Sequence, residues 1–161
     1  MTRLLFLLIS CTVLTGCGQN GVKGLVPASG TIEYDGKPMG GICIVLTPTI
    51  SSPSVYIGTA VSNENGIFTI RTLEQYGILP GNYNVSFSKT TSITTSDSGN
   101  QDPNAMDYTP PVIITKQELP DQYLSSETSG ITVTIPSTGD QNIRFQLKPG
   151  TITHFPPTPK I

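Results

Sequence analysis

The side chains most able to do chemistry are scarce, because the 161 residues include three cysteines and one histidine. His154 lies in a proline-rich tail, and Cys43 lies in the apolar run from Ile42 to Leu46. A zinc site takes about four ligands, mostly Cys and His, and a Ser-His-Asp triad would need the distant His154. We therefore predict no enzyme, no metal and no cofactor, and a buried, unreactive thiol at Cys43.

Oxygen ligands are concentrated in one segment that is rich in Ser, Thr and Gly. They are Asp97, Asn100, Asp102, Asn104 and Asp107. Carboxylate and amide oxygens can hold Ca²⁺, but this spacing is not that of an EF-hand loop. We favour a solvated, exposed loop over a calcium site. Long loops on a rigid scaffold often carry recognition, so these residues are the predicted binding loop.

The remaining candidate is Cys17, which ends a short apolar stretch. One basic residue, Arg3, precedes the stretch from Leu4 to Leu14. That stretch is shorter than the roughly 20 residues that cross a bilayer as a helix, and it has the length of a signal-peptide core. We predict that residues 1–16 are a targeting segment.

The residues Leu-Thr-Gly-Cys at 14–17 resemble the bacterial lipobox. The resemblance implies cleavage between Gly16 and Cys17, a diacylglyceryl thioether on Cys17, and acylation of the new amino group with a chain such as palmitate. Each buried methylene contributes about 0.8 kcal/mol, so several chains anchor a protein permanently. Gly18 stands where Asp marks inner-membrane retention in some bacteria, which favours the outer membrane, facing the periplasm or the cell surface. An ordinary secretory signal with an incidental cysteine is the alternative.

The composition favours a turn-rich β protein. Hydrophobic residues make up 36% and charged residues 12%, with 16 Gly and 14 Pro in no collagen-like period. The formal net charge of −2 provides no basic field for a polyanion, which argues against a nucleic-acid partner.

Short β-type runs separated by turn residues predict an all-β fold. Three runs alternate apolar and polar residues, as strands do with one face on a core and one in water; they are 83–87, 131–135 and 143–147. We also predict strands over 28–34, 41–47, 54–61 and 67–71, and an edge strand over 112–115. The run 41–47 is apolar nearly throughout and is expected to be buried on both faces. No run has a helical period, so we expect little helix beyond one short turn.

Four segments are expected after the signal is removed. They are a flexible tether over 17–27, a β-sandwich over 28–149, a long loop over 90–129 inside it, and a proline-rich tail over 150–161. Within the long loop, residues 90–104 are expected to be exposed. Leu119 and Tyr123 are expected to pack on the sandwich as a lid.

Three stretches resemble the carboxypeptidase regulatory-like domain: SGTIEYDGKPMGGICIVLTP (29–48), TAVSNENGIFTI (59–70) and LPGNYNVSFSK (79–89). The matching positions are Gly30, Asp35, Gly36, Pro38, Gly41, Val45, Thr59, Gly66, Phe68, Pro80, Gly81, Tyr83 and Val85. Asn63 stands where Asp is usual. The runs LPDQYLSSETSGITVTI (119–135) and NIRFQLKPG (142–150) resemble small bacterial envelope lipoproteins built on this domain.

The resemblance implies a seven-strand, Greek-key sandwich of the transthyretin (prealbumin) type. It also implies a non-enzymatic module in the cell envelope with a structural, binding or accessory role. The membrane, through Cys17, and an envelope protein or a glycan are the expected partners.

The alternative function is a carbohydrate-binding module at the cell surface. Sugar rings stack on exposed aromatic side chains, and the chain has no Trp. The candidate platforms are Tyr56, Tyr76, Tyr108 and Tyr123.

Overall fold

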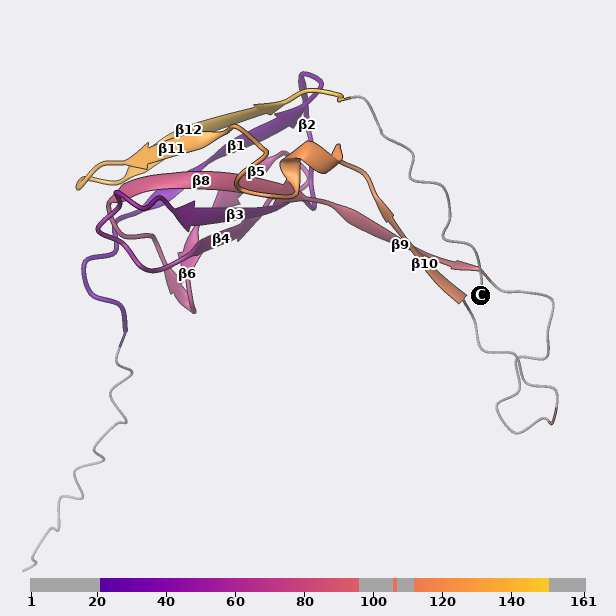
Figure 1. The fold of residues 1–161 in the computed structure, drawn as a ribbon, viewed down its shortest axis with the longest axis horizontal. Coiled ribbons are helices and arrows are strands. Elements are labelled where there is room, and N and C mark those ends of the chain that lie inside the picture. Colours follow the sequence, from indigo (N-terminus) through magenta and orange to yellow (C-terminus); the bar gives the residue numbers. More distant parts are fainter. Residues whose placement is uncertain (1–20, 96–105, 107–111, 151–161) are drawn as a thin grey trace, which may run out of the picture.

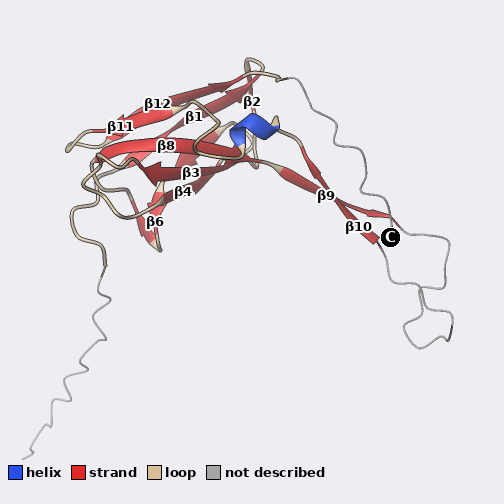
Figure 2. Ribbon diagram, in the orientation of Figure 1, coloured by secondary structure: helices blue, strands red, loops and turns tan. Residues whose placement is uncertain are grey.

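The protein is a β-sandwich with a projecting two-stranded arm (Figures 1 and 2). The computed structural model describes residues 21–95, 106 and 112–150. The described part contains strands and one 3₁₀ turn, η1 (Asp121–Tyr123), so the predicted all-β class is confirmed. None of the helical structure in that part is long and apolar enough to cross a membrane.

The first sheet is built around β1 (Ala28–Tyr34). On one side β1 pairs in parallel with β12 (Asp140–Leu147), with Ile32 opposite Phe145. On its other side it pairs antiparallel with two short strands, β5 (Ile67–Thr69) and β2 (Lys37–Pro38).

The second sheet is antiparallel and runs in the order β11, β8, β3, β4, β6, β7. Its strands are β11 (Thr132–Ile135), β8 (Gly81–Ser88), β3 (Cys43–Pro48), β4 (Gly58–Val61), β6 (Arg71–Thr72) and β7 (Gln75–Tyr76). The chain passes from the first sheet to the second between β5 and β6. This crossover ties the two sheets together at one edge. The Greek-key order stays a prediction.

The core lies between the sheets and is made by alternate residues of facing strands. On β8 the buried residues are Tyr83, Val85 and Phe87, and on β12 they are Ile143, Phe145 and Leu147. The alternation predicted for 83–87 and 143–147 is therefore confirmed. Phe145 stacks on Phe68 at 5.5 Å between ring centroids and meets Phe87 edge-on at 5.1 Å.

The predicted lid is also confirmed, because Leu119 and Tyr123 are buried. The Tyr123 ring meets Phe87 edge-on at 6.2 Å. Its hydroxyl accepts a hydrogen bond from the Lys148 amide at 3.0 Å, which links η1 to the end of β12.

Part of the predicted exposed loop 90–104 is a strand, so that prediction was wrong for its first residues. β9 (Thr90–Thr95) continues directly from β8 and pairs antiparallel with β10 (Val112–Gln117). Threonine and isoleucine favour extended backbone even in a polar segment. An ion pair closes the root of this arm, with Lys89 Nζ 3.0 Å from Glu118. Hydrogen bonds from Thr91 and Lys89, the largest causes, lower the pKa of Glu118.

Three further predictions need correction. The strand predicted over 54–61 begins only at Gly58. The Ser54 hydroxyl accepts a hydrogen bond from the Tyr56 amide at 3.2 Å, and this local bond replaces pairing with a neighbouring strand. The run 41–47 is not buried on both faces, since Cys43 and Val45 are half-buried. The described end of the predicted tether is attached to the sandwich, where Val26 and Ile78 exchange backbone hydrogen bonds of 2.9 and 3.0 Å.

The sandwich has two distinct ends, which we call the entry end and the arm end. The entry end holds residues 21–27, the loop 49–57 and the tip of the β6–β7 hairpin. The Thr49 amide bonds to the Asn82 carbonyl at the start of β8, and the Val22 amide bonds to Gln75 Oε1 at 2.6 Å. Strand β8 runs from there to the arm end, where β9 and β10 project away (Figure 1).

Gly30 is required by the close approach of β1 and β12. A Cβ at this position would lie 1.9 Å from the Ile143 carbonyl oxygen, a backbone atom that cannot move aside. Gly30→Ala should therefore lower the free energy of unfolding by about 3 kcal/mol or more. Gly36→Ala is the matched control: its Cβ meets open space, and only its φ of +73° is unfavourable, at about 1 to 2 kcal/mol. Urea unfolding followed by circular dichroism measures both, and equal losses would contradict the packing argument.

Tyr83 should make the fold sensitive to alkali. Burial raises the pKa of Tyr83 above the ordinary 10.0, partly offset by a Ser54 hydrogen bond. The folded state thus holds the Tyr83 proton more tightly than the unfolded state does. The contribution of the protonated hydroxyl to the free energy of unfolding is full below pH 10 and is lost as the pH rises through the folded pKa. Tyr83→Phe cannot ionise and loses the 2.7 Å bond to the Leu79 carbonyl, at about 1 kcal/mol. Between roughly pH 9 and 11 the melting temperature should fall more in the natural protein than in this variant; parallel curves would refute the assignment.

Candidate functional site

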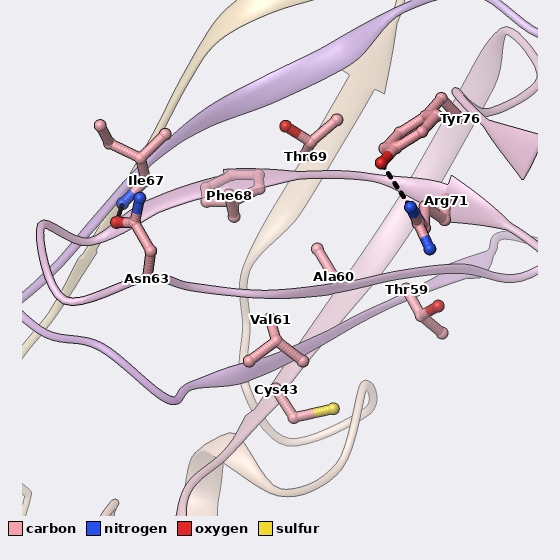
Figure 3. A pocket seen from close by; sticks show the side chains of 10 residues that line it. All are labelled: Cys43, Thr59, Ala60, Val61, Asn63, Ile67, Phe68, Thr69, Arg71 and Tyr76. Atoms are coloured by element: carbon pink, nitrogen blue, oxygen red, sulfur yellow. Dashed lines mark hydrogen bonds between the residues drawn. The ribbon is translucent and has the colours of Figure 1, made fainter.

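An open hollow of about 590 Å³ lies where β4 and β5 separate (Figure 3). Strand β4 leads into a turn and β5 follows it, but the two strands join different sheets, so in the described structure no neighbouring strand fills the edge between them. The residues around the hollow are Cys43, Thr59, Ala60, Val61, Asn63, Ile67, Phe68, Thr69, Arg71 and Tyr76.

The turn at one end of the hollow is fixed by Asn63. Its Oδ1 accepts hydrogen bonds from the amides of Asn65 at 3.0 Å and Ile67 at 2.9 Å. Gly66 follows with a φ of +73°, which a side chain would oppose. The Asn63 oxygen is therefore used inside the turn, and in the described part of the chain no three His, Cys, Asp or Glu side chains are grouped as metal ligands.

The other end carries a paired arginine and tyrosine. Arg71 and Tyr76 face each other across the two-residue strands β6 and β7. The guanidinium carbon lies 4.1 Å from the centroid of the Tyr76 ring, and Nη2 donates a hydrogen bond to the tyrosine hydroxyl (Figure 3). A cation over an aromatic face is attractive. Tyr76 is nevertheless 67% exposed, so the ring is held in place with most of its surface in solvent.

Cys43 borders the hollow, contrary to the predicted buried thiol. It lies directly opposite Val61, on the outer face of the second sheet. Both side chains are accessible, Cys43 partly and Val61 at 65%. The apolar run around Cys43 suggested burial on both faces, but no further layer covers this face in the described structure.

The polar side chains in the core have structural partners. The Ser62 hydroxyl accepts a hydrogen bond from the Ile42 amide at 3.0 Å and donates one to the Met39 carbonyl at 2.8 Å. The Thr72 hydroxyl donates a hydrogen bond to the Gly77 carbonyl at 2.8 Å. Within the described residues, no buried side-chain polar atom lacks a hydrogen-bond partner. What the hollow presents is one cation, an aromatic ring and neutral hydroxyl and amide groups, a set suited to reversible binding.

Most of the site residues predicted from the sequence lie outside the described residues. They are Gly16, Cys17, Asp97, Asn100, Asp102, Asn104, Asp107, Tyr108 and His154. Of the other tyrosine platforms, Tyr56 and Tyr76 are exposed. Tyr123 is 6% exposed and belongs to the lid, so its prediction as a platform was wrong.

Sequence reasoning missed Arg71. Its partner Tyr76 was identified as an isolated exposed aromatic, without the cation that holds it. No hairpin signal is present in the sequence here, because Leu73 and Glu74, which separate the two strands, are not the Asn-Gly or Asp-Gly type that marks a tight hairpin.

Comparisons with known proteins leave the family open. No protein-family model matches the chain, and no curated protein matches it either. Among solved structures, a 9R-lipoxygenase from Cyanothece PCC8801 is similar at 18% identity, over 89% of this chain and 19% of the lipoxygenase chain. Its TM-score of 0.32 is too low to carry an argument about fold or function.

Proposed function

We propose that this chain is a lipid-anchored protein of the bacterial cell envelope, held in the outer membrane through an acylated Cys17. The β-sandwich is a non-catalytic module of the carboxypeptidase regulatory-like type, with a structural, binding or accessory role. It faces the periplasm or the cell surface.

The observation that carries this proposal is that the described chain begins at the surface of the sandwich, a few residues after the lipobox-like motif at 14–17. Gly21, four residues past Cys17, is exposed, and Val22 is held at the surface by Gln75. A thioether-linked diacylglycerol on Cys17 can therefore enter a bilayer without displacing any part of the core.

The arm supports a binding role away from the membrane. Ile93, Ile113 and Ile114 are more than half exposed on two strands that have no neighbour on their outer edges within the described structure. Exposed apolar side chains and open strand edges are typical of surfaces that contact another molecule. The predicted binding loop joins the ends of these two strands, so the arm end is where an envelope partner would dock.

Substitution of Cys17 tests the anchor. Intact-mass analysis of the membrane fraction should find a chain that begins at Cys17 and carries the added mass of acyl chains. Cys17→Ser should leave an unacylated protein in the aqueous fraction, because serine offers no thiol for the thioether. Cys43→Ser is the matched control and should remain acylated and membrane-bound. Recovery of the natural chain without acyl chains, in the aqueous fraction, would remove the proposal.

Glycan binding is the second candidate, and the Arg71–Tyr76 pair favours it. A tyrosine ring fixed by a cation is a preformed stacking surface, and the hollow beside it is lined by the Thr59 and Thr69 hydroxyls, which can form hydrogen bonds.

The test is a glycan array followed by titration of any ligand that binds. Tyr76→Ala should weaken binding by about fivefold, since stacking on an aromatic ring contributes on the order of 1 kcal/mol. Tyr56→Ala removes another exposed tyrosine, outside the hollow, and should leave the affinity unchanged. No binding on the array, or equal affinities for the two variants, would eliminate this site.

A further inference from the structure

Large apolar side chains are exposed on the loops of the entry end. Ile50 is fully exposed, Val55 is 82% exposed and Ile57 is 50% exposed, all in the loop between β3 and β4. Leu73, at the tip of the β6–β7 hairpin, is 70% exposed. Single exposed apolar residues are ordinary, but a group of them on neighbouring loops marks a contact surface. We call these four residues the entry-end rim.

Leu73 is held in a conformation that its residue type disfavours. Its φ is +54°, in the left-handed region where Gly, Asn and Asp are common and branched side chains are rare. A polar turn residue would be more stable in water at the tip of a two-residue hairpin. The leucine is thus presented outward at a local cost, which is the pattern of a residue selected for contact.

The rim lies at the end of the sandwich from which the chain leads back toward Cys17. Val22 bonds to Gln75, two residues from Leu73, and the loop 49–57 lies at the start of β8 at the same end (Figure 1). Four residue steps separate Cys17 from Gly21. An extended chain covers at most about 3.6 Å per residue, so an acylated Cys17 keeps Gly21, the first described residue at this end, within about 14 Å of the membrane.

We propose that the entry-end rim enters the headgroup region of the membrane that holds Cys17, so that the protein is fixed upright by both its lipid and its loops. This inference rests on the proposed lipid anchor. Apolar side chains at an interface are buried about 5 to 10 Å deep, a range that the short connection allows. Residues 49–57 contain no charged side chain, so entry of this loop requires no desolvation of a charge, whereas Glu74, exposed beside Leu73, has to stay among the polar headgroups. The occupant of this surface is the lipid bilayer.

Tryptophan fluorescence tests the depth of the rim, because the natural chain contains no Trp and each introduced Trp is the sole reporter. Leu73→Trp and Val55→Trp place it on the rim, and Val55 avoids the unusual backbone of Leu73. Ile113→Trp, on the arm, is the matched control, since Ile113 is 64% exposed at the opposite end. Each acylated variant is reconstituted in phosphatidylethanolamine–phosphatidylglycerol vesicles, with and without brominated acyl chains, and checked by flotation and circular dichroism.

The rim variants should show a blue-shifted emission that brominated lipid quenches, whereas Ile113→Trp should emit as in water and remain unquenched. Variants that float with the vesicles but are all unquenched would overturn the inference and leave the anchor intact. A blue shift that depends on protein concentration but not on bromine would assign the rim to a second copy of the chain and also overturn it. A chain with Cys17 intact that is recovered without acyl chains and does not float would instead overturn the proposed function, and the inference with it.

Discussion

The contact between Phe145 and Phe87 is the interaction on which the rest of the structure depends. Phe145 belongs to the first sheet and Phe87 to the second, and their rings meet edge-on at 5.1 Å. An edge-to-face pair gains energy beyond the burial of its area and also fixes a relative orientation. Phe68 stacks on Phe145 from the same sheet, and Tyr123 covers Phe87 from outside. The lid, both sheets and the β5 crossover thus share one aromatic cluster.

This arrangement explains where the structure leaves surface open. The two sheets are held together at the aromatic cluster, but β4 and β5 part at one edge because they belong to different sheets. The hollow with Tyr76 and Arg71 forms there. At the entry end, an antiparallel bridge between Val26 and Ile78 ties the start of the described chain to the sandwich. The loops beyond that closure carry apolar residues that the core does not use.

The sequence pattern was sufficient where apolar and polar residues alternate strictly along a strand. Residues 83–87 and 143–147 alternate strictly, and burial follows the pattern residue by residue. Burial of Leu119 was also predictable, since a large apolar residue in a polar segment usually finds a core. The pattern failed at Cys43, because an apolar run does not reveal whether a second layer covers it.

The arm and the Arg71–Tyr76 pair were beyond local reasoning for different reasons. Residues 90–95 have no apolar alternation, and their strand depends on pairing with 112–117, a partner distant in sequence. The arginine and tyrosine meet because a hairpin turns at Leu73, a residue whose type argues against such a turn. Pairing and strained turns are decided by the whole fold rather than by neighbouring residues.

The direct continuation of β8 into β9 gives the molecule a mechanical axis. Strand β8 is hydrogen-bonded on both sides, to β3 and to β11, and these bonds run across the strand direction. Tension applied at the tip of the arm passes along β8 toward the opposite end and loads the whole ladder in shear, so many bonds must give way together. A protein fastened at one end and gripped at the other would therefore resist extraction by force far better than its modest size suggests.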